Sequence, residues 1–189
     1  MSQTVTYATG NALKIEIASS ILADYGVKVE AKKLDLPEIQ SVDGKEVCEF
    51  AAVHAAKLLN CTVVKTDVSY SIPSLNGFPG PFVKYINQWL SPNDICLLMQ
   101  DKEDRSVVIV DFLTIANPNG EIQTFKSSTQ ATLTDTPDIK SIKGSTFDRL
   151  LIRQGYSLPQ SMLTPEDLDK IFRRDVEVWH QLGKYLKGL

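Results

Sequence analysis

The chain has 189 residues, of which 43% are hydrophobic; this is enough for one sizeable core, so we expect a single domain over residues 1–189. The formal net charge of −3 argues against a nucleic-acid partner, because proteins that bind nucleic acids usually carry a basic surplus. The sequence shows neither a signal-peptide pattern nor an apolar run long enough to cross a bilayer. We therefore expect a cytoplasmic protein without a membrane partner, with its three cysteines reduced.

The first elements alternate between strand and helix. Residues 4–8 predict a strand, and the turn at residues 9–11 leads directly into a helix. The apolar residues on one face of that helix are Leu13, Ile17, Ile21 and Leu22. The helix ends near Gly26, which suits a left-handed C-cap, and residues 27–29 predict the next strand. This order of elements predicts an α/β fold.

The middle of the chain combines a second helix, a buried strand and a proline-rich turn. Residues 46–59 predict a helix, and residues 62–65 predict a strand that ends at Asp67. We expect the inner face of the helix to consist of Val47, Phe50, Ala51, His54, Ala55 and Leu58. His54 is therefore expected to be a packed core residue. Another helix should follow Pro81, because proline suits the first helical position.

The second half predicts a hairpin and a long terminal helix. Residues 107–116 and 121–131 resemble strands, and the Asn-Pro-Asn-Gly turn at residues 117–120 joins them. Thr164 and Pro165, followed by two acidic residues, predict the start of the last helix. The residues that this helix is expected to turn toward the core are Leu168, Ile171, Phe172, Trp179, Leu182 and Leu186.

The turn between the first strand and the first helix is a candidate anion site. The N–H groups and the dipole at the start of a helix favour an anion. Gly10 lets the backbone approach a phosphate closely, and the side chains of Thr9 and Asn11 can donate hydrogen bonds. Lys14, about one turn into the helix, can reach a phosphate oxygen. The alternative is a helix cap followed by an exposed lysine.

Two carboxylates, Glu38 and Asp67, form a candidate magnesium site. Asp67 follows a strand that we expect to be buried, and the carboxyl ends of strands in α/β sheets commonly face ligands. Magnesium prefers oxygen ligands and often takes one or two carboxylates together with substrate phosphates. It would also lower the pKa of a bound water and so supply a nucleophile. The alternative is that both acids lie on the solvated surface.

Two further basic segments have both a structural and a functional interpretation. The Gly-Phe-Pro-Gly-Pro sequence at residues 77–81 is either a structural turn or a support for Lys84 beside a phosphate. The last helix carries Lys170, Arg173 and Arg174, which form either a solvated face or a contact to base or phosphate.

Four segments together resemble the inosine triphosphate pyrophosphatase family, enzymes that remove non-canonical purine nucleotides. They read ATGNALK at residues 8–14, DLPEIQ at 35–40, Thr-Asp at 66–67 and LNGFPGPFVK at 75–84. Their order and separations also match those of the family. The resemblance is specific over residues 4–90, whereas the second half is similar only in outline.

The resemblance implies a mixed central sheet with flanking helices, two lobes around a central cleft, and a homodimer. It implies magnesium-dependent hydrolysis of a nucleoside triphosphate to the monophosphate and pyrophosphate. Glu38 and Asp67 would hold Mg²⁺, and Asp67 would also place or activate the attacking water. The residues assigned to the triphosphate are Thr9, Gly10, Asn11, Lys14 and Lys84. Those assigned to the base are Phe147, Asp148, Arg173 and Arg174.

Several positions depart from the family pattern. The family usually has a second acid before its aspartate, where this chain has Thr66, and a hydroxyl after it, where this chain has Val68. A lysine expected on the second helix falls at Ala51. In the base-recognition segments, Ser145-Thr146-Phe147-Asp148 keeps only the aromatic residue and the acid, and Phe172-Arg173-Arg174 keeps only the arginine.

These departures leave two functions open. One is a nucleoside triphosphate pyrophosphatase with an altered base preference, since loss of hydrogen-bond donors to a purine removes discrimination. The other is a nucleotide-binding or regulatory protein on the same fold that does not catalyse hydrolysis. An unrelated hydrolase gains no support, because the chain contains no G-x-S-x-G segment.

Overall fold

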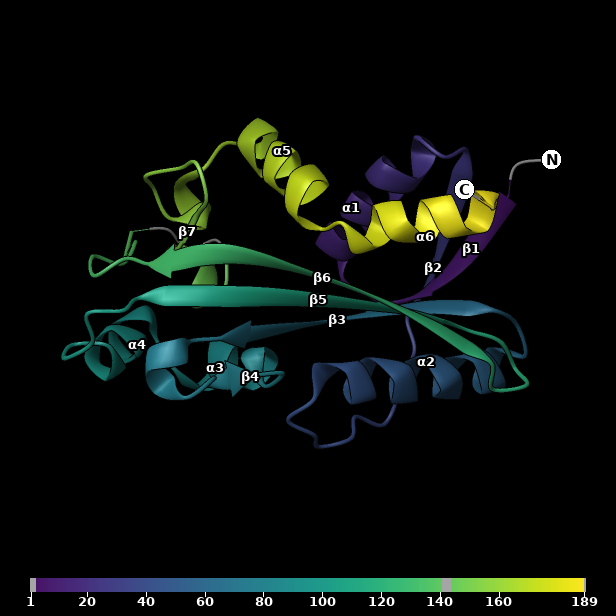
Figure 1. The fold of residues 1–189 in the computed structure, drawn as a ribbon, viewed down its shortest axis with the longest axis horizontal. Helices are drawn as coiled ribbons and strands as arrows, with labels where there is room; N and C mark the ends of the chain where they lie inside the picture. The colour runs from purple at the N-terminus through teal and green to yellow at the C-terminus, as the bar shows by residue number, and fades with distance from the viewer. Residues whose placement is uncertain (1–2, 141–143, 189) are drawn as a thin grey trace. The chain divides into compact units, whose positions relative to one another are not determined.

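The computed structural model describes residues 3–140 and 144–188 of the chain (Figure 1). The strands are β1 (Gln3–Ala8), β2 (Val27–Lys32), β3 (Val63–Ser71), β4 (Pro79–Gly80), β5 (Ser106–Ala116), β6 (Ile122–Leu133) and β7 (Leu151–Arg153). The α-helices are α1 (Ala12–Ala23), α2 (Gly44–Leu59), α3 (Val83–Trp89), α4 (Pro92–Leu98), α5 (Pro165–Asp175) and α6 (Val178–Lys187).

The strands form one mixed sheet in the order β2-β1-β3-β5-β6-β7, with β4 paired to β3. β1 pairs in parallel with both β2 and β3, whereas β4 and β7 pair antiparallel with β3 and β6. β5 and β6 are neighbours joined by the turn at residues 117–120, so the predicted hairpin is confirmed. The α/β class with a mixed central sheet and flanking helices is likewise confirmed. The central cleft stays a prediction.

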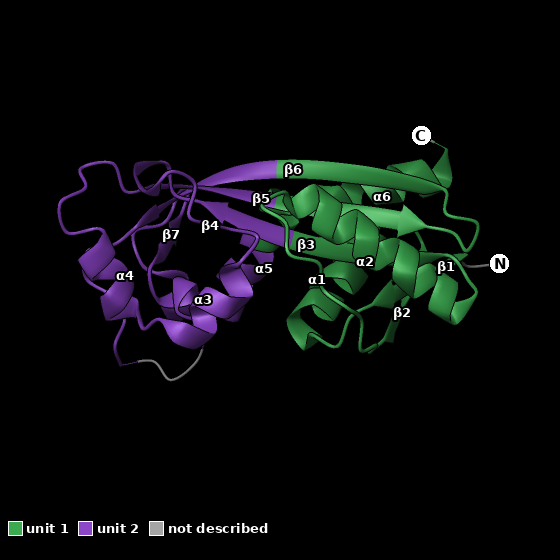
Figure 2. Ribbon diagram, turned by 90° about the horizontal axis from the view of Figure 1, so that it is seen from below, with its two compact units in different colours: residues 1–67, 111–127, 172–189 green, residues 68–110, 128–171 purple. Residues whose placement is uncertain are grey.

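The chain divides into two compact units, which Figure 2 colours separately. Unit 1 consists of Met1–Asp67, Asp111–Ser127 and Phe172–Leu189, and unit 2 consists of Val68–Val110 and Ser128–Ile171. The boundaries between the units fall inside three strands, β3, β5 and β6, and inside the helix α5. Each unit has its own hydrophobic core.

In unit 1, the sheet is covered on both faces (Figure 1). Side chains of α1 and α6 pack on one face around Tyr7, whose ring meets Trp179 edge-on at 5.0 Å between centroids. Small residues of α2 pack on the other face against Ala8, Val63 and Ala116. Because side chains alternate along a strand, Val64 joins the first core and Val63 the second.

In unit 2, the described residues form a core around Phe147, Leu150 and Leu151. Residues of α3 and α4, among them Ile86 and Ile95, pack against it. α4 begins with a capping box in which Ser91 and Asp94 exchange hydrogen bonds. This helix was not predicted, although Ser-Pro-x-Asp is a helix-start signal that the sequence displays.

The predicted inner face of α2 is only partly correct, because Ala51 and Ala55 are buried but the larger predicted residues are not. Phe50 and Leu58 are 39% and 60% exposed, and His54 is exposed and stacks on Phe50. The buried stripe instead consists of Gly44, Cys48, Ala51, Ala52, Ala55 and Ala56. Small side chains allow the helix backbone to approach the sheet closely, so the larger apolar residues are turned outward.

Two other element predictions need correction. β3 continues to Ser71, so Asp67 lies within a strand and not at its end. The last helix is interrupted, because α5 ends at Asp175 and α6 begins at Val178. The N-terminal prediction for α5 is confirmed, since the Thr164 hydroxyl accepts a hydrogen bond from the backbone N–H of Asp167. Across the described ranges, none of the helices has the length and hydropathy needed to cross a bilayer.

Candidate functional site

The turn from β1 to α1 is built by the side chains that the sequence singles out. Asn11 is the N-cap of α1 and accepts a hydrogen bond from the Lys14 backbone N–H at 3.2 Å. The Thr9 hydroxyl accepts from the Asn11 N–H at the same distance. Gly10 is exposed, and the side chain of Lys33 packs over it so closely that a Cβ at Gly10 would lie 2.9 Å from Lys33 Cγ. The capping interpretation is thus correct, while the anion-binding role stays a prediction.

Lys65 is a central charged residue that the sequence analysis missed. It lies on β3, and its ammonium donates a hydrogen bond to the carbonyl of Ala8, the last residue of β1, at 3.2 Å. Burial lowers the pKa of Lys65, and the charge of Lys14 lowers it further, while Cys48, Asp67 and Glu38 act in the opposite direction. Three predicted residues, Lys14, Glu38 and Asp67, therefore lie within electrostatic range of one ammonium group.

The sequence did carry a signal for Lys65. It follows Val63 and Val64, both buried, and stands two residues before Asp67. Residues at i and i+2 of a strand share a face, so Lys65 and Asp67 project from the same side of β3. Lys65 is itself half-buried, and a lysine drawn out of water in this way usually has a partner.

The two carboxylates differ in their surroundings. Glu38 is exposed in the loop between β2 and α2, whereas Asp67 is half-buried and its Oδ2 atom is buried. No group of three or more His, Cys, Asp or Glu that could hold a metal is found within residues 3–140 and 144–188. A pair of carboxylates fits Mg²⁺, which commonly completes its coordination with water and substrate phosphates.

Two uncharged side chains, Cys48 and Tyr7, contact β3 beside Lys65 and Thr66. The Cys48 thiol on α2 lies 3.4 Å from the carbonyl oxygen of Lys65, and burial raises the pKa of Cys48 to about 11. On the opposite face of β3, the Thr66 hydroxyl is hydrogen-bonded to the Tyr7 hydroxyl. Burial raises the pKa of Tyr7 far above its usual range, so the phenol is uncharged at neutral pH.

In unit 2, the Gly/Pro segment before Lys84 has a clear structural role. β4 pairs with β3 through Ser71–Pro79 and Tyr70–Gly80, which places the turn along that strand. Gly77 and Gly80 both adopt positive φ, at 90° and 61°, where residues with a Cβ are disfavoured. Lys84 itself is exposed, with its ammonium 5.6 Å from the centre of the Tyr85 ring. Its place beside a phosphate stays a prediction.

The residues of unit 2 that were predicted to bind the base are buried or hydrogen-bonded within the protein. Phe147 is 0% exposed and meets Tyr70 edge-on, so stacking on a base would require the ring to become accessible. Asp148 accepts a hydrogen bond from the Ser145 N–H at 2.7 Å and another from Gln160 Nε2 at 2.9 Å. Gln160 in turn accepts from Arg153 Nε at 2.9 Å, and this network was not predicted.

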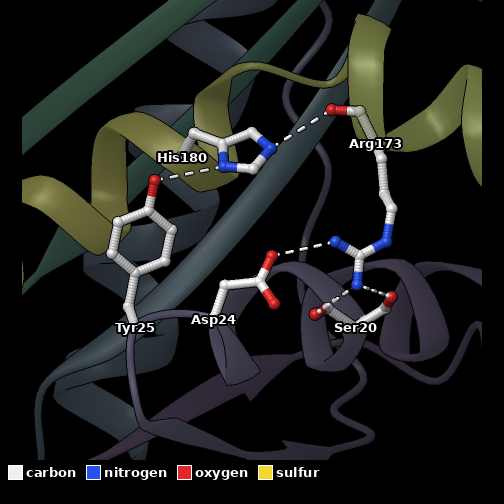
Figure 3. Close-up of polar contacts among 5 residues, drawn as sticks. All are labelled: Ser20, Asp24, Tyr25, Arg173 and His180. Carbon is white, nitrogen blue, oxygen red and sulfur yellow. Dashed lines mark hydrogen bonds and ion pairs between the residues drawn. The ribbon is translucent and has the colours of Figure 1, made fainter.

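In unit 1, Arg173 connects α5 to α1 (Figure 3). Its guanidinium donates to Asp24 Oδ2 at 2.9 Å and to the carbonyl and hydroxyl oxygens of Ser20 at 3.0 and 2.8 Å. The carbonyl of Arg173 lies 3.1 Å from His180 Nε2, and His180 Nδ1 lies 3.1 Å from the Tyr25 hydroxyl. Sequence reasoning could not find contacts between residues this far apart in the chain.

Arg174 contacts its neighbour Asp175, with its Nη2 atom 3.1 Å from Asp175 Oδ2. Asp175 is 5% exposed, so the arginine balances a buried carboxylate. Arg173 and Arg174 thus both have protein partners in this structure. Their predicted roles in substrate binding, like those of Phe147 and Asp148, stay predictions.

The fold defines the class of protein. A Ham1 protein from Coxiella burnetii superimposes with a TM-score of 0.80 at 18% identity, covering 99% of this chain and 100% of the other. The Ham1 protein of Staphylococcus aureus gives a TM-score of 0.77 at 22% identity, covering 98% and 99% of the two chains. At these identities the likeness establishes the fold.

The sequence then establishes the family. The sequence model of the Ham1 family matches residues 5–176, and the chain belongs to this family. A dITP/XTP pyrophosphatase of Methanopyrus kandleri is 31% identical over 170 residues, covering 90% of this chain and 89% of that protein. An inosine triphosphate pyrophosphatase of Mycosarcoma maydis is 26% identical over 193 residues, covering 98% and 96% of the two. The resemblance inferred from the four segments is thereby confirmed.

Proposed function

We propose that this protein hydrolyses non-canonical purine nucleoside triphosphates, in the presence of Mg²⁺, to the monophosphate and pyrophosphate. Its membership of the Ham1 family, together with pyrophosphatase relatives that match over nine-tenths of the chain, makes it a nucleoside triphosphate pyrophosphatase. The metal, the choice of base and the residue roles are the parts that we propose.

One observation carries the proposal. Lys14, Glu38 and Asp67 come from three separate segments of the sequence, yet all lie within electrostatic range of Lys65. Charges of both signs around Lys65 suit both the phosphates of a nucleotide and a divalent cation. The exposed turn at residues 9–11 adjoins the same place, because Lys65 hydrogen-bonds to Ala8.

The chain's own groups can then perform distinct tasks. The N–H groups at the start of α1 and the ammonium of Lys14 would bind the phosphates and orient the anhydride bond between the α- and β-phosphorus atoms. Glu38 and Asp67 would hold Mg²⁺, which when bound neutralises phosphate charge and makes a coordinated water more acidic. Asp67 would orient the attacking water and accept its proton at a carboxylate oxygen. Pyrophosphate would leave as the new bond to the α-phosphorus forms.

The alternative is a nucleotide-binding protein that does not catalyse hydrolysis. Thr66 supports it, because a hydroxyl bonded to Tyr7 occupies the position of an acid in the family pattern. Pyrophosphate release, measured with inosine, xanthosine, adenosine and guanosine triphosphates with and without Mg²⁺, separates the two functions. Release that depends on Mg²⁺ would support the proposal, and triphosphate binding without release would support the alternative.

We further propose that the protein is a cytoplasmic homodimer, as the family resemblance implies. Light scattering during size-exclusion chromatography would measure the assembly, with a dimer mass expected and a monomer mass contradicting it. Fractionation of cells that express the protein would test its location.

A further inference from the structure

Lys65 is a half-buried lysine on an interior strand of the sheet. β3 is an interior strand of the sheet, between β1 and β5, and Val63 and Val64 beside Lys65 are 0% and 1% exposed. Because burial disfavours the charged form of lysine, the ammonium group is expected to have a partner there.

The protein itself provides only part of what the ammonium group needs. An ammonium group has three N–H donors, and the Ala8 carbonyl accepts one of them at 3.2 Å. That carbonyl directly precedes the exposed turn at residues 9–11, so Lys65 is held at the edge of the predicted phosphate site. The hydrogen bond fixes the position of the ammonium while leaving donors for another acceptor.

A second cation strengthens the case for an anionic ligand. Lys14 lies close enough to Lys65 to disfavour its charge, whereas the carboxylates of Glu38 and Asp67 favour it. Two neighbouring ammonium groups repel each other, and a bound polyphosphate would turn that repulsion into attraction. The carboxylates are compatible with such a ligand, since a divalent cation bound with it would balance their negative charge.

The neighbouring helix α2 has no lysine at the position where the family pattern places one. In the position on α2 where the family pattern has a lysine, this chain has Ala51, which is 7% exposed. Cys48, one turn earlier on α2, lies against the carbonyl of Lys65 with a buried, neutral thiol. This part of α2 therefore offers no cation to the site, and Lys65 projects from β3 on the side that α2 covers.

We propose that Lys65 is a substrate-binding residue whose ammonium group contacts a phosphate oxygen of the triphosphate, supplying from β3 the charge that α2 lacks at Ala51. This inference rests on the proposed function, because it assigns a further residue to the same phosphate site. The competing explanation is that Lys65 only ties the end of β1 to β3 through the Ala8 carbonyl.

The test is calorimetric binding of a non-hydrolysable α,β-imido analogue of inosine triphosphate, with Mg²⁺, to the full chain. Lys65→Gln removes the charge but keeps a donor for the Ala8 carbonyl, so its thermal unfolding temperature without ligand should stay within about two degrees of wild type. Its affinity for the analogue should fall about ten- to a hundredfold, the usual effect of losing a charge-assisted hydrogen bond. Lys65→Arg, which keeps the charge, should bind at least threefold more tightly than Lys65→Gln.

The matched control is Lys57→Gln, since Lys57 is an exposed lysine at the end of α2; its affinity should equal that of wild type. An affinity of Lys65→Gln within twofold of wild type would overturn the proposal, and a lower unfolding temperature with unchanged affinity would assign Lys65 the purely structural role. If the wild-type protein does not bind the analogue, the proposed function itself fails, and this proposal fails with it.

Discussion

The phosphate side and the base side of the predicted site use their charged residues differently. In unit 1, Lys14, Glu38 and Asp67 all act electrostatically on Lys65, whose ammonium adjoins the turn at residues 9–11. The residues predicted to recognise the base are instead engaged with the protein, Asp148 with Gln160 and Arg173 with Ser20 and Asp24. The predicted phosphate residues therefore gather around one ammonium group, whereas the predicted base residues form hydrogen bonds within the protein.

The strongest way to break this comparison is Asp67→Asn, which keeps the shape and removes the charge. We expect turnover to fall about a hundred- to a thousandfold, because a magnesium ligand and the proton acceptor are lost together. Folding should be little affected. Steady-state pyrophosphate release measures the effect, with Asp101→Asn, an exposed carboxylate of unit 2, as the control. A wild-type rate for Asp67→Asn would remove Asp67 from the metal site.

Lys14→Ala tests the phosphate side through binding. We expect the affinity for a non-hydrolysable triphosphate to fall about ten- to a hundredfold, since a charge-assisted contact to phosphate is worth about 1.5–3 kcal/mol. Titration calorimetry would measure it, and Lys28→Ala, which alters an exposed lysine on β2, provides the comparison. An unchanged affinity would leave the turn at residues 9–11 with its capping role alone.

Base preference tests the other side of the comparison. We expect inosine triphosphate to be preferred over ATP or GTP by less than about a hundredfold (~2.7 kcal/mol), because fewer free donors leave less to discriminate with. Values of kcat/KM for the three substrates, measured side by side, decide this. A thousandfold preference would mean that other residues have taken over recognition of the base.

The smallest effect is expected at Arg173. Arg173→Ala should lower the free energy of unfolding by about 1 kcal/mol, since it removes a partly exposed ion pair and hydrogen bonds to Ser20. Urea denaturation measures it, and a double-mutant cycle with Asp24→Ala isolates the ion pair. If Arg173→Ala lost affinity for inosine triphosphate but no stability, Arg173 would belong to the base site after all.

The sequence predicted well where the pattern is local. The strand at the N-terminus, helix α1 and the cap at Asn11 follow from periodicity and from one side chain's hydrogen-bonding capacity within four residues. It failed where packing decides, as on α2, where alanines are buried and Phe50 is turned outward. The bond from Arg173 to Ser20 spans 153 positions, and no local pattern contains such a contact.

The residues of the candidate site likewise fall into those that local motifs indicate and those that depend on long-range packing. Glu38, Asp67 and Lys14 could be chosen from motifs, but nothing in the motifs includes Lys65, whose importance depends on the pairing of β1 with β3. Likewise, the expectation that Asp67 ends a strand fails because the pairing of β4 with residues 70 and 71 extends β3 beyond it. Long-range strand pairing was the missing information in both cases.

The hydrogen bond between Thr66 and Tyr7 restricts which side chains can occupy position 66. Tyr7 is 1% exposed, and its hydroxyl meets the Thr66 hydroxyl on the face of β3 that packs around Trp179. A glutamate at position 66 would bring a longer, charged side chain against this buried phenol, and burying a charge is costly even where the phenol O–H donates to it. An acid at position 66 would therefore lose solvation beside Tyr7, so the side chains at positions 7 and 66 constrain each other.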